Sequence, residues 1–488
     1  MAGGEAFPGA TIGRDDARWE TMIRGFNLRW VANPDRVQVC GDAGQVLATV
    51  QRAYDEGKRI TVRSGGHCYE DFVCDNEGGV LIDLSPMNGV RREGTSKLFC
   101  VEGGATLWNV YNALYRDYGV TLPAGSCYAV GAGGHFTGGG YGLLSRLHGL
   151  TSDYLAAVEL VRVDSQGKAE LVRVGRDSSS EEEREIFWAH TGGGGGNFGI
   201  VTKFWFEDPP PAPKTVWLAS LAWDWKKLSE TDFSGLIQRY GDWHVANSDP
   251  GSRFAPLFAL LHLNQMANES SQIVLTVQVA DDNEALLREF AGDVAGGLPP
   301  VSGEPRSIQW LFATQLLDGM NPNEWGKYKS AYMNEGFPPH QIEALWRHLR
   351  EKPNEAAAQA LLQVDSYGCQ VNSVAPDATA VAQRSSVMKL QYQTYWNNEV
   401  KEGRPKDMAK AEKENLDWIR GFYEDMYGAN GPMPNGTMDG CFVNYPDGDL
   451  KDWQYLYYKD NYPRLRRAKS FSDPLDVFHH QQSIELAE

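Results

Sequence analysis

The sequence lacks the features of several large protein classes. It has no stretch approaching the roughly 18 apolar residues of a membrane-spanning helix, and its N-terminus shows no basic start followed by an apolar run, so no secretory signal is visible. Basic residues are few, since 46 Lys and Arg against 64 Asp and Glu give a net charge of -18. This charge disfavours nucleic acid and anionic membrane surfaces as partners. We therefore expect a soluble, cytoplasmic protein, and we leave its oligomeric state open.

Cysteine is also scarce. The seven cysteines show no paired spacing typical of a zinc site, and in a reducing compartment they should be mostly free thiols. We predict no metal site. The motifs H-E-x-x-H and G-x-S-x-G are both absent, which leaves a zinc hydrolase and a serine hydrolase without support. The remaining composition, 42% hydrophobic and 11% aromatic, is typical of a globular protein.

The length and two proline- or glycine-rich stretches suggest how the chain is divided. At 488 residues it is too long for one ordinary hydrophobic core, so two domains are expected. The run DPPPAP at residues 208–213 cannot form a helix or a central strand and is the clearest linker. A second boundary is expected within residues 430–440. Residues 178–185 (SSSEEERE) are interpreted as a solvated surface loop.

Local periodicity predicts a mixture of short strands and helices. Helical spacing marks residues 45–56, 107–119 and 407–427, the second of which ends on glycine. Apolar or alternating runs predict strands at residues 59–62, 79–84, 154–164, 200–207, 215–223 and 271–279. The last two alternate and follow the linker, so we expect an antiparallel sheet there.

Glycine is abundant and concentrated in a few segments. The segment GGGGNFG contains G-x-G-x-x-G at Gly194, Gly196 and Gly199, the spacing of a dinucleotide-binding turn. That turn requires a helix after it, whereas IVTKFWFE follows here and predicts a strand. The Rossmann interpretation therefore fails, and a glycine bed against a flat or charged cofactor fits better than a flexible loop.

A second cluster, PAGSCYAVGAGGHFTGGGYG, has eight glycines in twenty residues (123–142). We predict that these glycines turn bare N–H groups toward a ligand, an arrangement that binds pyrophosphate without helices. His135 within it is more often, taken alone, a structural hydrogen-bond partner than a catalyst. A third cluster, TVRSGGHCYED, places His67 after a strand and a Ser-Gly-Gly turn. Alone, this histidine is weak evidence of any function.

Together the three clusters resemble the berberine-bridge-enzyme-like oxidases of the vanillyl-alcohol-oxidase, or p-cresol-methylhydroxylase, superfamily. In that family the R-S-G-G-H motif supplies a histidine bonded to the flavin 8α-methyl carbon, and P-x-G-x-C-x-x-V-G-x-G-G-H supplies a cysteine bonded to flavin C6. Here these positions are His67 and Cys127. GGGGGNFGIVT matches the third flavin-binding stretch, and YYKDNYPRL and DPLDVFHHQQSI match the closing motifs.

The resemblance implies the fold and the cofactor site. The fold would be α+β, with a two-part FAD-binding domain formed by residues 1–208 and 441–488, and a substrate domain at 209–440 with an antiparallel sheet flanked by helices. FAD would be attached through His67 and Cys127. The other residues that the resemblance assigns to the cofactor are Arg63, Ser64, Gly65, Gly66, Gly125, Gly131, Gly133, Gly134, His135, Gly138, Gly139, Gly140, Gly142, Gly196, Asn197, Gly199, Ile200, Val201, Tyr458 and Asn461.

Oxidising an alcohol by hydride transfer to flavin N5 requires a base for the hydroxyl proton. The family places a tyrosine in N-Y-x-D-x-D-L, here Tyr445 in NYPDGDL. A tyrosine has a pKa near about 10, so a nearby cation is expected to stabilise its phenolate. Lys389 and Gln391 share one face of a predicted strand. A lysine that simply points to solvent is the alternative; the alkaloid-cyclising members have a glutamate at the position of Lys389.

Other tyrosines match active-site positions of the family. Tyr141 in GGGYG would hold the substrate oxygen or relay the proton, and Tyr69 would line the substrate side; both could instead be packing residues. Tyr367 in DSYGCQVN is a weaker candidate. Val130 and Ala132 are possible positions for a residue that governs oxygen access.

These features predict an FAD-dependent oxidase that dehydrogenates an alcohol carbon of a bulky substrate, either a secondary-metabolite or antibiotic intermediate or a sugar moiety of a glycoside. O2 would reoxidise the flavin and give hydrogen peroxide. The alternatives are an oxidative cyclase that forms a C–C or C–O bond, a secreted-type oligosaccharide oxidase, and a carrier with a vestigial flavin fold. The absence of glutamate at Lys389 argues against alkaloid cyclisation.

Overall fold

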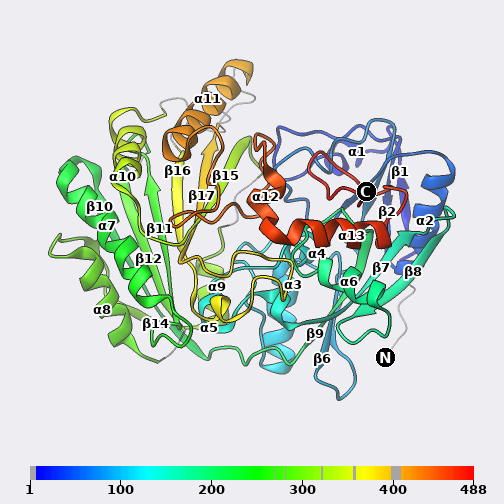
Figure 1. Ribbon diagram of the computed structural model, residues 1–488, viewed down its shortest axis with the longest axis horizontal. Coiled ribbons are helices and arrows are strands. Elements are labelled where there is room, and N and C mark those ends of the chain that lie inside the picture. The colour runs from blue at the N-terminus through cyan, green and yellow to red at the C-terminus, as the bar shows by residue number, and fades with distance from the viewer. Residues whose placement is uncertain are drawn as a thin grey trace.

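Three sheets form the framework of the protein in a computed structural model that describes residues 7–268, 270–280, 282–319, 323–354, 359–396 and 408–487. Two sheets belong to the N-terminal 207 residues and the third to the middle of the chain. Figure 1 shows them in two halves, with the blue and cyan N-terminal elements on the right and the green and yellow middle segment on the left. The mixture of helices and sheets confirms the α+β class.

In the first sheet the parallel strand β3 ends just before the Ser-Gly-Gly turn that leads to His67. The order of this sheet is β1-β2-β4-β3, in which β2, β4 and β3 are parallel and β1 is antiparallel. The helix α2 starts after Asp42, whose side chain accepts the Gln45 N–H. The predicted strands at 59–62 and 79–84 and the helix at 45–56 are confirmed. Element bounds are β1 Ala10–Ile12, α1 Trp19–Met22, β2 Arg36–Val39, α2 Ala43–Asp55, β3 Ile60–Arg63 and β4 Val80–Asp83.

The second sheet is antiparallel, in the order β5-β6-β9-β7-β8. Strand β9 directly follows the G-x-G-x-x-G segment, so the prediction of a strand there is confirmed. The interpretation of 178–185 as a loop is wrong. Ser180 is the N-cap of helix α6, its hydroxyl oxygen accepts the Glu183 N–H, and the three consecutive glutamates form the first turn of the helix. Element bounds are β5 Val90–Arg92, β6 Leu98–Glu102, α3 Leu107–Ala113, β7 Leu155–Val163, β8 Ala169–Gly175, α6 Glu181–Ala189 and β9 Ile200–Glu207.

The third sheet has eight strands, in the order β13-β10-β12-β11-β16-β17-β15 with β14 beside β10. Every ladder in it is antiparallel, which confirms the prediction for this segment. Its strands are β10 Thr215–Asp224, β11 Leu257–Asn264, β12 Gln272–Val279, β13 Val301–Ser302, β14 Arg306–Gln309, β15 Gly326–Met333, β16 Leu361–Ser366 and β17 Met388–Tyr395. Its helices are α7 Glu230–Asn247, α8 Glu284–Ala295, α9 Trp310–Leu316, α10 Pro339–Trp346 and α11 Met408–Tyr427.

The two faces of this sheet differ because its strands alternate. One face contributes Leu261, Val277, Val364 and Leu390 to the largest apolar core, where α7, α8, α10 and α11 cover them. In Figure 1, α7, α8 and α10 lie on the outer side of the sheet, away from the N-terminal half. The inner face carries polar residues, among them Lys389 and Asp365. Alternation therefore directs a row of polar side chains toward the N-terminal half.

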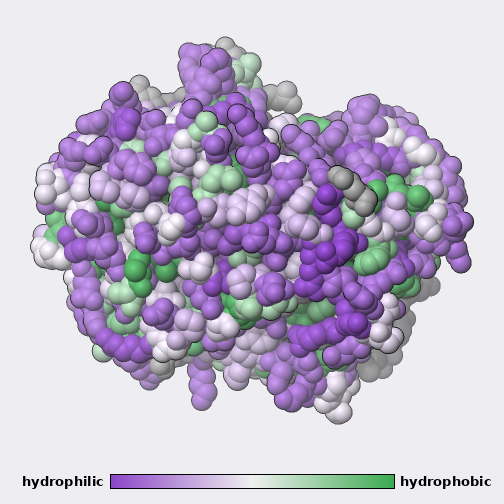
Figure 2. All heavy atoms as spheres, in the orientation of Figure 1, coloured by the Kyte–Doolittle hydropathy of each residue, from purple (hydrophilic) through white to green (hydrophobic). Residues whose placement is uncertain are grey.

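The tail returns to the N-terminal half. Helix α13 (Tyr462–Ser472) packs on α6, where Arg464 forms an ion pair with Glu185. Figure 1 shows α12 (Trp453–Tyr458) and α13 in red beside the N-terminal elements. The boundaries at 208 and 440 themselves stay a prediction. The face in Figure 2 is largely hydrophilic, with apolar residues scattered over it. No helix in the described ranges has the length and apolarity to cross a membrane.

Candidate active site

A cavity of about 340 Å³ lies where the inner face of the eight-stranded sheet meets the N-terminal half and the tail. All three glycine clusters contribute to its wall, together with Phe258 and Gln363 from the large sheet. The predicted site residues on this wall are Arg63, Ser64, Gly65, Gly66, His67, Tyr69, Gly125, Cys127, Gly131, Gly133, Gly134, His135, Tyr141, Gly142, Gly196, Asn197, Gly199, Ile200, Val201, Tyr445 and Tyr458.

A few predicted residues lie behind the wall. The amide of Asn461 donates to the backbone oxygens of Pro376 and Thr379, so it holds a loop in place. A Cβ on Gly138, Gly139 or Gly140 would lie 2.0–2.6 Å from side-chain atoms of the protein. These four residues therefore support the wall from behind. Of the two positions considered for oxygen access, Val130 lines the cavity and Ala132 is fully buried.

The glycines of 123–142 serve the fold more than the sequence suggests. Seven of the eight would place a Cβ at 3.1 Å or less from protein atoms; on Gly131, for example, it would lie 2.1 Å from Gly65 N. Only Gly134 has open space within 4 Å. Three of them, Gly131, Gly133 and Gly142, allow two backbone segments to touch. The prediction that all eight turn bare N–H groups to a ligand is wrong, because five of these N–H groups, those of Gly125, Gly133, Gly138, Gly139 and Gly142, donate to acceptors within the protein.

The same cluster is also not free of helix. Residues Ala132–Thr137 form the short helix α4, and Ser145–His148 form α5 just beyond the cluster. The expected arrangement without helices is therefore wrong at this point. The α4 backbone reaches the cavity through Gly133, Gly134 and His135. Gly131 precedes the first residue of α4, and because it has no Cβ its backbone can lie directly against the backbone of Gly65.

His67 and Cys127 line the same cavity. The His67 ring stacks on Phe26, with centroids 4.7 Å apart, and burial lowers its pKa to about 4, so the imidazole is neutral at physiological pH. Burial raises the pKa of the Cys127 thiol. The two residues thus present a neutral imidazole and a protonated thiol to one space.

His135 is held as a structural hydrogen-bond partner. Its Nε2 accepts the Gly125 N–H at 2.9 Å, and burial lowers its pKa to about 4. A ring that accepts through Nε2 must be neutral, in agreement with this pKa. Asn197 similarly donates to Gly193 O and accepts from Ile484 N, which ties the glycine loop to the tail. Both residues shape the wall through protein contacts.

Two residues of β17 meet two tyrosines. Lys389 Nζ lies 3.1 Å from the Tyr445 hydroxyl, and Gln391 Nε2 donates to the Tyr69 hydroxyl at 3.0 Å. The Tyr69 and Tyr445 rings have centroids 5.7 Å apart. Lys389 is fully buried, which excludes the alternative of a lysine that points to solvent.

Asp365 is the residue that the sequence interpretation missed. Its Oδ2 lies 2.8 Å from Lys389 Nζ, and both side chains are buried. The two residues face each other in the register of β16 and β17. A signal was present in DSYGCQVN, but the weaker candidate chosen from that motif, Tyr367, donates instead to the backbone oxygen of Gln383. Asp365 lines the cavity and Tyr367 does not.

The charge balance around Tyr445 differs from the expected one. Burial raises its pKa well above the usual value, and the carboxylate of Asp365 raises it further. Burial also lowers the pKa of Lys389, and Asp365 opposes this effect. The lysine predicted beside Tyr445 is present, but burial lowers its pKa, and burial together with Asp365 keeps Tyr445 a neutral phenol here.

Tyr141 lies on the other side of Lys389. Its ring centroid is 4.8 Å from Lys389 Nζ, and its hydroxyl donates to Ser366 O at 2.6 Å. The hydroxyl proton is thus used by the backbone, while the oxygen still has a lone pair that can accept a hydrogen bond. The Tyr141 oxygen can therefore accept a hydrogen bond, and its role in holding the substrate oxygen or relaying the proton stays a prediction.

Comparison with known proteins gives consistent relatives. Family models of the FAD binding domain and of berberine and berberine-like proteins match residues 34–170 and 441–485. Aclacinomycin-N/aclacinomycin-A oxidase from Streptomyces galilaeus is 40% identical over 97% of this chain and 89% of its own. Hexose oxidase from Chondrus crispus is 36% identical over 97% and 94%. The crystal structure of a glycopeptide hexose oxidase complexed with teicoplanin superposes with a TM-score of 0.90 at 35% identity, covering 98% and 99%.

The glycine-walled cavity, the superposition and the matched FAD-binding domain define the protein as an FAD-dependent oxidoreductase. More narrowly, the chain belongs to the berberine-bridge-enzyme-like family of FAD-linked oxidases, whose members match it over nearly its whole length.

Proposed function

We propose that FAD is attached through His67 and Cys127 and that the enzyme oxidises an alcohol carbon of a sugar, or of a sugar-bearing secondary metabolite. Both attachment residues line one cavity, whose wall has open space at Gly134. His67 is neutral because of its low pKa and can act as a nucleophile through a ring nitrogen. Cys127 must lose its thiol proton before it can bond to carbon.

The single observation that carries the proposed reaction is the 3.1 Å contact between Lys389 and Tyr445, which itself lines the cavity. When bound, the flavin supplies the acceptor for a hydride from the substrate carbon and passes the electrons to O2 as hydrogen peroxide. Tyr445 takes the proton of the substrate hydroxyl. Because Tyr445 is itself a neutral phenol, its own proton must leave at the same time.

Lys389 is the acceptor for that proton. Burial lowers its pKa, which raises the share of neutral amine that can accept a proton from Tyr445. The ammonium so formed is then neutralised by Asp365 at 2.8 Å. The substrate oxygen loses one proton to Tyr445, Tyr445 passes one to Lys389, and the charge remains balanced. A lysine at this position, in place of a carboxylate, favours alcohol oxidation over cyclisation.

The substrate class rests on the cavity and on the relatives. The wall on the substrate side combines Phe258 and Leu260 with Gln363, which suits a ring carrying hydroxyl groups. The relatives are named for aclacinomycin, for hexoses and for a glycopeptide with a hexose. We therefore infer a hexose unit, free or attached to a larger natural product, as the oxidised group.

The cofactor claim has a direct test. Purified protein should be yellow, and the colour should remain with the polypeptide after acid precipitation. Cys127→Ala should retain one bond and His67→Ala the other, each with a changed absorption spectrum, while the double variant should release all flavin. Flavin found wholly in the supernatant of the unmodified protein would overturn the double attachment.

The base is tested by Tyr445→Phe, which removes one oxygen atom. A peroxidase-coupled screen of hexoses, oligosaccharides and glycosylated aromatic antibiotics first selects the substrate with the highest kcat/KM. On that substrate Tyr445→Phe should lower kcat by about 10²–10⁴-fold with the flavin still bound. Full turnover in this variant would remove Tyr445 from the mechanism.

A further inference from the structure

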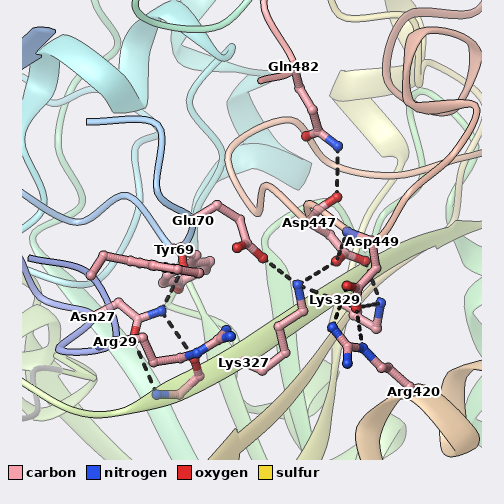
Figure 3. Close-up of polar contacts among 12 residues, drawn as sticks. Asn27, Arg29, Tyr69, Glu70, Lys327, Lys329, Arg420, Asp447, Asp449 and Gln482 are labelled. Atoms are coloured by element: carbon pink, nitrogen blue, oxygen red, sulfur yellow. Dashed lines mark hydrogen bonds and ion pairs between the residues drawn. The ribbon is translucent and has the colours of Figure 1, made fainter. Parts of the chain in front are cut away.

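Behind the cavity lies a group of charged side chains that the proposed reaction does not use. Its members come from the loop after β3, from β15, from α11 and from the segment after Tyr445. Figure 3 shows them converging on two lysines of β15. We name this group the lysine clamp; it consists of Glu70, Lys327, Lys329, Arg420, Asp447 and Asp449.

One cation of the lysine clamp joins the loops of two active-site tyrosines. Lys327 Nζ binds the carboxylate of Glu70, the residue after Tyr69. The same Nζ donates to Asp447 Oδ1 at 2.7 Å, two residues after Tyr445. The side chain of Lys327 is only 3% exposed. A single buried ammonium thus connects the peptide beside Tyr69 to the peptide beside Tyr445.

Asp447 is fixed at each of its polar groups. Its second carboxylate oxygen accepts from Lys329 at 2.8 Å. Its N–H donates to the Tyr457 hydroxyl, and its backbone oxygen accepts from Gln482 at 2.8 Å. With these bonds the position of Asp447 has little freedom, and Tyr445 is only two residues away. Asp449 adds a link from Lys329 to Arg420 of α11.

Strand β15 also holds Tyr69 by contacts outside the clamp. The Tyr328 ring stacks on the Tyr69 ring, with centroids 3.7 Å apart. Asn27 donates to both Tyr69 O, at 2.6 Å, and Gly326 O, at 3.1 Å. Lys327 and Tyr328 therefore contact Glu70 and Tyr69 directly, and Asn27 links Gly326 to Tyr69. Figure 3 shows Asn27, Tyr69 and Glu70 arranged beside this strand.

The same strand is paired with β17, which carries Lys389 and Gln391. In that ladder Tyr332 faces Lys389 and Ser330 faces Gln391. Strand β15 therefore sets the spacing between the two tyrosines, Tyr69 and Tyr445, and the β17 residues that they contact. On one side β15 fixes the register of β17, and on the other the clamp fixes the loops of Tyr69 and Tyr445.

Lys327 and Asp447 of the clamp keep their charges over the working range of pH. Burial opposes the charge of Lys327, but Asp447, Glu70 and Asp449 outweigh this effect and raise its pKa. Burial opposes the charge of Asp447 in the same way, and Lys327 and Lys329 lower its pKa. Lys327 and Asp447 therefore exchange no proton near neutral pH and can act only through position.

We propose that Lys327 is a positioning residue for the oxidation: it fixes the Tyr445 hydroxyl against Lys389 and the Tyr69 hydroxyl against Gln391. The inference rests on the proposed function, because it assigns value to the placement of Tyr445. Buried ion pairs contribute little net stability relative to apolar packing. These ion pairs instead fix the orientation of the Asp447 side chain, since each of its carboxylate oxygens accepts from a different lysine.

The first experiment compares three variants of the flavin-loaded enzyme on the substrate selected by the peroxide screen. Lys327→Met removes the charge and keeps the chain length, and it should lower kcat by about 10–100-fold, because a displacement near 1 Å can cost that much. Lys327→Arg keeps the charge and should recover most of the loss. The matched control is Arg384→Met, which removes another buried cation, the ion-pair partner of Asp153. This variant should lower the melting temperature and leave kcat within about threefold.

A double variant separates positioning from a purely structural role. If Lys327 acts through Tyr445, then Lys327→Met should cost almost nothing further in kcat once Tyr445 is Phe. Losses that multiply, or a Lys327→Met enzyme with unchanged kcat, would overturn the inference. An unimpaired Tyr445→Phe enzyme would instead overturn the proposed function, so the two failures are distinct.

A crystal structure of Lys327→Met gives a readout that does not depend on turnover. The Tyr445 hydroxyl should move away from Lys389 Nζ by on the order of 1 Å, whereas it should stay in place in Arg384→Met. An unmoved Tyr445 in Lys327→Met would contradict the positioning role even if the variant were less stable.

Discussion

Lys389 and Lys327 lie on neighbouring strands of one sheet, and both are buried. Their pKa values move in opposite directions. Lys389 has the carboxylate of Asp365 beside it, and burial prevails and lowers its pKa. Lys327 faces Asp447, Glu70 and Asp449, which outweigh burial and raise its pKa. The number of carboxylates brought to a buried amine therefore decides whether it can exchange a proton or only hold position.

The largest effect is expected from the partner that Lys327 and Lys329 share. Asp447→Asn leaves two buried lysines with less compensation and should lower the free energy of unfolding by about 3–5 kcal/mol. A lowered folded pKa means that this stabilisation is complete above the ordinary carboxyl pKa of about 3.9 and is lost as the pH falls through the folded value.

Melting temperatures of Asp447→Asn and the unmodified enzyme, measured from pH 8 to pH 3, check this. Their difference should be constant down to about pH 4 and shrink only below it. A difference that already disappears near pH 6 would mean that Asp447 is not held charged by the two lysines.

The second effect concerns the other lysine. Lys389→Met removes the proposed acceptor of the Tyr445 proton and should lower kcat by about 10²-fold, with flavin attachment unchanged. Because the variant also leaves the buried carboxylate of Asp365 without its cationic partner, the matched control is Lys389→Met combined with Asp365→Asn. This double variant should regain melting temperature without regaining kcat. If kcat returned together with stability, Lys389 would have only a structural role.

A smaller effect is expected when the carboxylate beside Lys389 is removed, which tests how the number of nearby carboxylates sets the pKa of a buried lysine. Asp365 raises the pKa of both Lys389 and Tyr445. Asp365→Asn should therefore lower both values and move the rise of kcat with pH toward lower pH. The asparagine oxygen can still accept from Gln363, which donates to Asp365 at 2.7 Å. Profiles of kcat from pH 5 to pH 10 test the sign, and a shift to higher pH would contradict it.

The smallest effect is expected at the edge of the clamp. Arg420 is 48% exposed and pairs with Asp449. Because water screens this pair, Arg420→Met should cost about 1 kcal/mol or less in stability, with kcat unchanged. Urea unfolding and steady-state kinetics check both. A large loss of kcat would mean that positioning extends from Lys327 through Lys329 to α11.

Local patterns were sufficient for much of the fold and for part of the site. The strands at 59–62, 79–84 and 200–207 and the helix at 107–119 follow from short-range periodicity, and the helix ends on Gly119 at φ 71°. Alternation alone placed Lys389 and Gln391 on one face. The resemblance of the three glycine clusters selected His67, Cys127 and Tyr445 as candidates.

Other features depended on segments that meet only after folding. Asp365 reaches Lys389 through the register of β16 and β17. Lys327 and Glu70 are 257 residues apart, and Lys327 and Asp447 are 120 apart. The glycines of 123–142 were misjudged for the same reason, since what a Cβ would strike depends on the chain packed against it.

The sequence by itself determined which residue types stand on each face of each strand, and where the backbone could bend closely, because both depend on neighbours a few positions away. Only the tertiary structure decided how many opposite charges surround each buried group, because those charges come from distant segments. That number sets the state of Lys389, Tyr445 and Lys327, and with it the difference between a group that can transfer a proton and one that holds the site in place.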